Sequence, residues 1–313
     1  MAIISATFLA QLQNVATLDA NQLHTHLTNS TSLINATIIP NTIIDTTTHY
    51  NISRAIAFDY IDFTRVQFEN VVFKNCTFSN CRFLSAKFIS CKFHNCFFNS
   101  CDFRYSTFNQ TSVNPKRIAK SIDFKTENNV GADVFGKLIG SLRDDNNRDY
   151  QIDAQYLYRI YRRKYKLREG RLAIQQFRTQ GKTLERIGTF FRTYFENIRD
   201  WLYWFIAQYG LKFTHTFLFI LIVSISFTII NYYSWSFYFD IPYEDYVKSN
   251  PSHIITWGKA FHYTFVSMSS LGYNEYFIPT TRIGVILTGI QTILGAIGLG
   301  AITTFFISRL IRF

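Results

Sequence analysis

The stretch VVFKNCTFSNCRFLSAKFISCKFHNCFFNSCDF, residues 71–103, repeats itself every five residues. Phenylalanine returns at this spacing without interruption from Phe58 to Phe108. Two places before each Phe stands a small or β-branched residue, and the positions between are mostly polar. A period of five fits neither the turn of an α-helix nor the two-residue alternation of a strand. Each pentad is therefore predicted to form one short side of a coiled prism, with a turn at its corner.

This pattern resembles the pentapeptide-repeat family, whose chains form a right-handed quadrilateral β-helix. The resemblance covers Ile56 to about Val113, and weaker pentads at Leu33, Ile38 and Ile43 hold the same phase. Four pentads are expected to close one coil, and stacked coils to pile identical side chains into ladders. We expect each Phe, and the small residue two places before it, to point inward.

All the cysteines of the chain lie in this repeat and share the small-residue position. Because Ser, Ala, Ile and Val occupy equivalent positions, the cysteines are predicted to pack in a core rather than to form disulfides. A ladder of thiols that binds a soft metal such as zinc or copper is the less favoured alternative. The first segment also lacks the pattern of a cleaved signal peptide. Together with the expectation that the thiols stay reduced, this predicts that the N-terminus lies in the cytosol. The cysteines are Cys76, Cys81, Cys91, Cys96 and Cys101.

The charge of the repeat restricts its function. Between Phe58 and Val113 six Lys or Arg stand against four Asp or Glu. A mildly positive surface cannot imitate a phosphate backbone, which disfavours the DNA mimicry known in some pentapeptide-repeat proteins. The favoured interpretation is a rigid scaffold, or a docking module for an unknown cytosolic ligand or protein.

Residues 116–212 carry 20 Lys or Arg against 11 Asp or Glu, and so supply most of the net charge of +11. Apolar residues recur there at helical spacing, which predicts at least two amphipathic helices with a break near Gln180 and Gly181. Basic flanks are typical of the cytoplasmic side of membrane helices, and the aromatic cluster from Trp201 to Phe205 is typical of the lipid interface. Because no groove-reading or base-stacking motif is present, nucleic acid is not expected as a partner.

Two long segments without formal charge follow, Phe213 to Phe239 and Ile283 to Ser308. Each can supply a helix long enough to cross the hydrocarbon core of a lipid bilayer. The loop between them is slightly acidic and both outer flanks are basic, so both termini are expected to face the cytosol. The sequence thus predicts a multi-pass protein of a bacterial-type inner membrane.

The loop between the two segments contains a short, aromatic-rich helix, predicted over Trp257 to Ser269. The string FVSMSSLGYNEY at its end resembles the pore region of two-transmembrane potassium channels, where a re-entrant pore helix leads into a Thr-Val-Gly-Tyr-Gly-Asp selectivity filter. In this comparison Phe265, Ser267 and Ser269 belong to the pore helix. Along the filter, Ser270 takes the Thr place, Leu271 the Val place, Gly272 and Tyr273 match, Asn274 replaces the second Gly and Glu275 the Asp.

The resemblance implies a homotetramer whose backbone carbonyls replace the water ligands of a monovalent cation. The carbonyls of Ser270, Leu271, Gly272 and Tyr273 would bind the ion. Gly272 adopts the required backbone geometry without steric penalty, and Asn is the residue type that best replaces Gly at positive φ. Glu275 would place four carboxylates at the pore mouth and attract cations.

The second apolar segment is rich in glycine, which permits close helix packing. In channels similar to this chain the inner helix bends at a central glycine, and Gly295 is the hinge candidate, with packing as the alternative. Polar residues such as Gln291 and Thr292 are expected to face a wet pore. No catalytic arrangement rises above background, so no enzyme activity and no cofactor other than the permeant ion are expected.

The sequence therefore predicts a mixed membrane protein in four parts. These are an N-terminal segment (1–30), a β-helix (31–115), a basic helical connector with an interfacial helix (116–212) and an all-α two-helix pore domain (213–313). The expected function is a tetrameric, potassium-preferring cation channel whose β-helix regulates opening or docks a partner. Two alternatives stay open: a non-selective cation channel, and a membrane-anchored β-helix scaffold or receptor.

Overall fold

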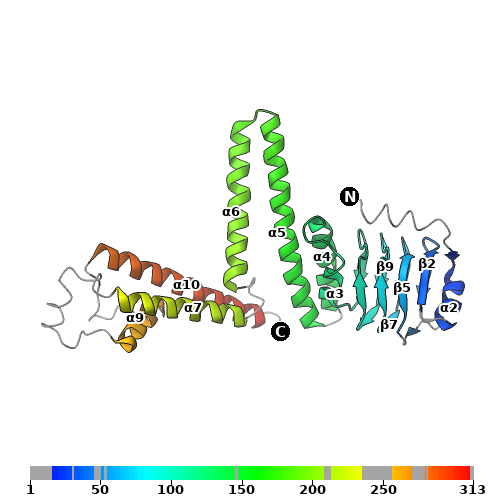
Figure 1. Ribbon diagram of the computed structural model, residues 1–313, viewed down its shortest axis with the longest axis horizontal. Coiled ribbons are helices and arrows are strands. Elements are labelled where there is room, and N and C mark those ends of the chain that lie inside the picture. The colour runs from blue at the N-terminus through cyan, green and yellow to red at the C-terminus, as the bar shows by residue number, and fades with distance from the viewer. Residues whose placement is uncertain are drawn as a thin grey trace. The chain divides into compact units, whose positions relative to one another are not determined.

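The computed structural model of the chain describes residues 16–29, 32–45, 51–52, 55–144, 147–207, 213–234, 256–269, 279 and 281–310. Its contacts divide the chain into two units, Met1–Asn197 and Ile198–Phe313, which are described separately (Figure 1). The first unit contains a β-solenoid and the helices that follow it. The second contains a group of three helices.

Short parallel strands build a solenoid of about four turns in the first unit. They form three sheets, ordered β1-β2-β5-β8-β11, β10-β7-β4 and β12-β9-β6-β3, and single bridges from Asp62 to Arg82 and from Arg82 to Asp102 form a fourth side. The strands are β1 (Ala16–Leu18), β2 (Ser32–Ile38), β3 (Ile43–Asp45), β4 (Asn51–Ile52), β5 (Ala57–Asp62), β6 (Gln67–Glu69), β7 (Val72–Lys74), β8 (Thr77–Ser79), β9 (Lys87–Ile89), β10 (Lys92–His94), β11 (Phe97–Asn99) and β12 (Thr107–Asn109).

Identical side chains stack along the solenoid because pairing strands are 20 residues apart, as in Phe58 with Phe78 and Phe78 with Phe98. The ring centroid of Phe78 lies 4.7 Å from that of Phe58 and 5.2 Å from that of Phe98, with the rings nearly parallel. The repeated Phe residues, and the small residues two places before them, are all at most 6% exposed. The predictions of four pentads per coil and of inward Phe ladders are confirmed.

The corners of the solenoid are residues with positive φ. Every fifth residue from Tyr60 to Gln110 has φ between 47° and 60°, and none of them is glycine. Asn tolerates this left-handed conformation better than other non-Gly residues, and it occupies several corners, among them Asn75 and Asn80. The chain therefore turns through a single residue and starts the next side at once.

The cysteines are free and buried, which confirms that they pack in the core. The thiols of Cys81, Cys91, Cys96 and Cys101 donate hydrogen bonds to carbonyl oxygens of the preceding coil, as from Cys101 Sγ to Phe78 O at 3.3 Å. Thr111 occupies the same position one coil after Cys91, and its hydroxyl donates to Phe88 O at 3.1 Å. Where this inward position holds Cys91, Cys101 or Thr111, the buried side chain also donates a hydrogen bond, whereas Ala, Ile and Val at equivalent positions only pack.

The stability of the solenoid is expected to fall as pH rises above about 9. Burial raises the pKa of the Cys91 thiol from 9.0 to about 12. Between these values the unfolded chain has released the proton and the folded chain still binds it, so the free energy of unfolding decreases by about 1.4 kcal/mol per pH unit. Urea unfolding near pH 8 and pH 10.5 measures the loss. The variant Cys91→Ala, which copies the residue at Ala86, should lose less stability than the wild type, and an equal loss in both would contradict this assignment.

Helices cover both ends of the solenoid. At the start, α2 (Ala20–Asn29) packs on β1 and β2, and its Leu23 is 2% exposed. At the other end, α3 (Pro115–Ala119) and α4 (Asn128–Asp144) pack on the last coil. The hydroxyl of Ser141 on α4 accepts a hydrogen bond from Thr111 N at 2.7 Å and donates one to Thr111 O at 3.0 Å. These helices thereby cover strands at both ends of the solenoid, where exposed edges could pair with other chains.

Two long helices follow, α5 (Arg148–Thr179) and α6 (Thr183–Ala207), joined by a turn at Gly181 with φ of +71°. The predicted pair of helices and the break between them are confirmed. α5 is fixed on α4 by Tyr161, whose hydroxyl donates to Ile122 O at 3.1 Å. Gly131 of α4 lies against this ring so closely that a Cβ there would overlap it.

Besides the end of α6, the second unit contains α7 (Phe213–Tyr233), α9 (Trp257–Ser269) and α10 (Arg282–Leu310), which pack side by side (Figure 1). By length and composition two of these helices could cross a membrane. The segments are Thr214–Tyr233 with mean hydropathy 1.9 and Arg282–Thr304 with mean hydropathy 2.0.

Candidate pore site

α9 is a short helix that contacts both long apolar helices, α7 and α10. Its bounds, Trp257–Ser269, are those predicted from the sequence. With 13 residues it is about 20 Å long, whereas the hydrocarbon core of a bilayer is about 30 Å thick. It therefore cannot cross a membrane by itself and depends on its two neighbours for its position.

A buried hydrogen-bond network joins the three helices. Asn231 of α7 donates from Nδ2 to Thr264 Oγ1 of α9 at 2.8 Å, and its Oδ1 accepts from Gln291 Nε2 of α10 at 2.8 Å. All three side chains are 0% exposed. An unpaired amide in such surroundings costs several kcal/mol, so the network favours one relative placement of the helices.

A second polar contact joins α9 to α10. The hydroxyls of Tyr263 and Thr288 are 2.7 Å apart, and Thr288 Oγ1 donates its proton to Gly284 O at 2.9 Å. The bond between the two hydroxyls connects α9 to α10 independently of the amide network.

The end of α9 lies against a glycine of α10. A Cβ added at Gly295 would overlap the carbonyl oxygen of Met268, and one added at Gly298 would lie 2.9 Å from Ile220 Cγ1 of α7. Added Cβ atoms at Gly289 and Gly300 would meet nothing within 4 Å. The contact supports packing as the role of Gly295, and the hinge stays a prediction.

The structure places only part of the predicted site. Phe265 is 57% exposed, while Ser267 and Ser269 are half-buried. The Ser269 hydroxyl donates to Val266 O at 3.2 Å and so belongs to the last turn of α9. The filter and mouth residues, 270–275, lie outside the described residues.

One prediction about this region is wrong. Gln291 does not face a wet pore, because it is fully buried and bonded to Asn231. The prediction assumed that a polar side chain in an apolar helix is hydrated. Gln291 instead donates a hydrogen bond to the side-chain amide of Asn231 on α7. Asn231, Thr264 and Tyr263 were not singled out from the sequence. The available signal was an Asn within an uncharged, apolar segment, close to the end of α7.

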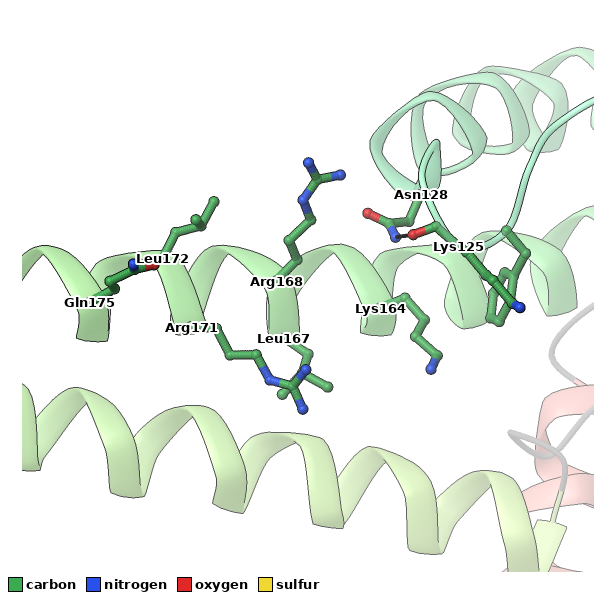
Figure 2. A pocket seen from close by; sticks show the side chains of 9 residues that line it. Lys125, Asn128, Lys164, Leu167, Arg168, Arg171, Leu172 and Gln175 are labelled. Carbon is green, nitrogen blue, oxygen red and sulfur yellow. Dashed lines mark hydrogen bonds between the residues drawn. The ribbon is translucent and has the colours of Figure 1, made fainter. Parts of the chain in front are cut away.

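A cavity of about 370 Å³ in the first unit is lined by basic side chains of α5 and by residues before and at the start of α4. Figure 2 shows that these side chains diverge, with Arg168 and Leu172 extending from one side of α5 and Arg171 from the other. Asn128 is held by a bond from Nδ2 to Lys125 O at 3.3 Å. Because the cations do not converge on one point, this cavity has no arrangement suited to a single anion.

Comparison with known protein families matches residues 67–104 to pentapeptide repeats, in 8 copies. The matched residues belong to the solenoid and include none of the helices that follow it. No curated protein and no solved structure matches the chain. The comparison thus supports the pentapeptide repeat, and no match supports the resemblance to potassium channels.

Proposed function

We propose that the chain is one subunit of a homotetrameric, potassium-preferring cation channel in a cytoplasmic membrane. The observation that carries this proposal is the placement of α9. It is too short to cross a bilayer and it contacts two helices that are long enough. Buried hydrogen bonds hold it to both, through Thr264 to Asn231 of α7 and through Tyr263 to Thr288 of α10. A short helix in this position supports a re-entrant segment, since a membrane tolerates irregular backbone only where protein or a water-filled path surrounds it.

The C-terminal end of α9 is the part that would matter for conduction. The carbonyl oxygen of Met268 lies against Gly295, which fixes the helix end directly before residues 270–274. The C-terminal end of a helix also carries partial negative charge, which favours a nearby cation. The contact at Gly295 would help to orient the carbonyls of Ser270 to Tyr273 toward one axis, and the charge at the helix end would favour a cation there.

The exposed faces of the second unit fit association with further copies and with lipid. Phe261 and Phe265 of α9 are 54% and 57% exposed, and Ile286 and Ile293 of α10 are both 61% exposed. Apolar surface of this extent is buried in functional assemblies. Four copies around a central axis would bury part of it and leave the rest to the acyl chains.

Purified protein in liposomes should conduct potassium, and Gly272→Ala should abolish the flux while folding and tetramerisation survive. The alanine side chain would penalise the backbone geometry that the filter requires. Gly140→Ala on α4, where an added Cβ meets nothing within 4 Å, is the matched control and should conduct like the wild type.

Reversal potentials in potassium and sodium gradients separate a potassium-preferring pore from a non-selective one. A protein that is monomeric in lipid, or a folded tetramer without cation flux, would contradict the channel. The membrane-anchored scaffold would then be the better account.

A further inference from the structure

The two helices of the α5–α6 hairpin meet through polar side chains. Gly170 of α5 lies directly against Thr193 of α6, and Lys166 Nζ lies 3.5 Å from Glu196 Oε2. The partly covered positions of α6 that share this side are spaced by three or four residues. They are Arg186, Thr189, Thr193, Glu196, Asn197 and Asp200, with the aromatic Trp204 at the end of the row.

The opposite face of α6 is apolar and exposed along the whole helix. Leu184 is 84% exposed, Phe191 68% and Phe195 71%. The same face continues to the end of the helix through Ile187, Ile198, Trp201, Leu202 and Phe205. A hairpin that is stable in water buries such a face between its helices, but this hairpin turns it outward.

The position of α6 in the chain limits what can cover this face. Only residues 208–212 separate α6 from α7, and a linker of this length spans at most about 22 Å. If α7 crosses a membrane, the end of α6 stays close to the membrane surface. The apolar face extends from there over a helix of 25 residues, about 37 Å.

The composition of α6 favours lipid as the occupant. Phe and Trp rings make up much of the apolar face, as is typical of helices that lie in the interface between headgroups and acyl chains. The charges on α6 balance, with three Arg and three acidic residues. Burial of apolar surface, rather than attraction to anionic lipid, would therefore drive binding. The residues are Arg186, Arg192, Arg199, Glu185, Glu196 and Asp200.

We propose that α6 is an interfacial helix that lies flat on the membrane, with its apolar face among the lipids and α5 on its water side. This inference rests on the proposed function in requiring that α7 and α10 span the bilayer. It extends the lipid contact from the aromatic cluster at residues 201–205 to the whole of α6. The solenoid then attaches to the membrane surface through the hairpin.

Nitroxide labels on single introduced cysteines test this placement in the full chain, reconstituted in vesicles of phosphatidylcholine. The native thiols are buried, so each label should attach at a stoichiometry of one, which also confirms that the solenoid is folded. Leu184→Cys, Phe191→Cys and Ile198→Cys probe the apolar face. Their neighbours Glu185→Cys, Arg192→Cys and Arg199→Cys are the matched controls, and Ile222→Cys on α7 is the reference inside the bilayer.

Electron paramagnetic resonance with oxygen, which concentrates in lipid, and chelated nickel, which stays in water, measures the depth of each label. We expect the apolar-face labels to show an oxygen-to-nickel accessibility ratio several-fold above that of their neighbours. If neither reagent reaches the apolar-face labels, a second copy of the chain covers this face. If chelated nickel reaches them, the face is exposed to water. Either result overturns the inference. If the separately labelled Ile222→Cys variant is exposed to lipid in the same vesicles, the proposed channel is unaffected, whereas a water-exposed label there would contradict the membrane span itself.

Discussion

Gly295→Ala is expected to abolish cation flux and to destabilise the assembled second unit. The added Cβ would overlap the Met268 carbonyl oxygen, a backbone atom that cannot move without α9. Overpacking of this kind costs about 1–3 kcal/mol and sometimes more. Because Met268 lies two residues before Ser270, the shift would reach the filter directly. Potassium flux from liposomes and the thermal midpoint of the detergent-solubilised protein measure both effects.

Gly289→Ala provides the control on the same helix, since an added Cβ there meets nothing within 4 Å. It should conduct like the wild type, with an unchanged or slightly higher thermal midpoint, because alanine favours helix over glycine by about 1 kcal/mol. The thermal midpoint also separates packing from a hinge. Loss of a hinge at Gly295 would reduce flux at unchanged stability, whereas the steric overlap lowers both. Wild-type flux in Gly295→Ala would contradict both roles.

Phe83→Ala is expected to destabilise the solenoid by about 3–5 kcal/mol, the usual cost of removing a buried aromatic ring. Phe83 is 1% exposed, and its ring stacks between Phe63 and Phe103 with centroids 5.1 Å away on either side. A cavity in this place has no neighbour that can fill it, because each coil has one Phe per side. The native cysteines provide the measurement in the full chain, since their reaction with a thiol reagent during a urea titration reports the opening of the same core.

The matched control for Phe83 is Lys92→Ala, whose side chain is exposed on β10. An exposed substitution of this kind normally changes stability by about 0.5 kcal/mol or less. If Phe83→Ala lost no more than this control, the stacked ladder would not be the source of the stability of the solenoid.

The solenoid was predictable because its signal is local and repeated. Each pentad from Phe58 to Phe108 carries its own inward pair, so one misjudged position would not have changed the fold. In the first coil the five-residue period no longer predicts the register. Leu33 pairs with Phe58 and Ile44 with Phe68, offsets of 25 and 24 residues rather than 20, and α2 lies between β1 and β2. The period does not encode how long an insertion is or what it forms.

The candidate pore site was predictable only in part, for the opposite reason. The bounds of α9 followed from the aromatic-rich segment between two apolar ones. The hydrogen bond between Asn231 and Gln291 joins residues 60 positions apart, and no spacing in the sequence links them. Each polar residue could be recognised as costly in an apolar helix, but its partner depends on how the helices pack.

The 20-residue register of the solenoid has a consequence for changes in its length. Removing four pentads would delete one complete layer and leave every stack of rings aligned, moving the point where α4 attaches by about 4.8 Å along the axis. Removing a single pentad would instead turn that attachment point by a quarter of a revolution. Insertions and deletions of whole layers would thus change the length of the solenoid while α4 keeps the same orientation about the solenoid axis.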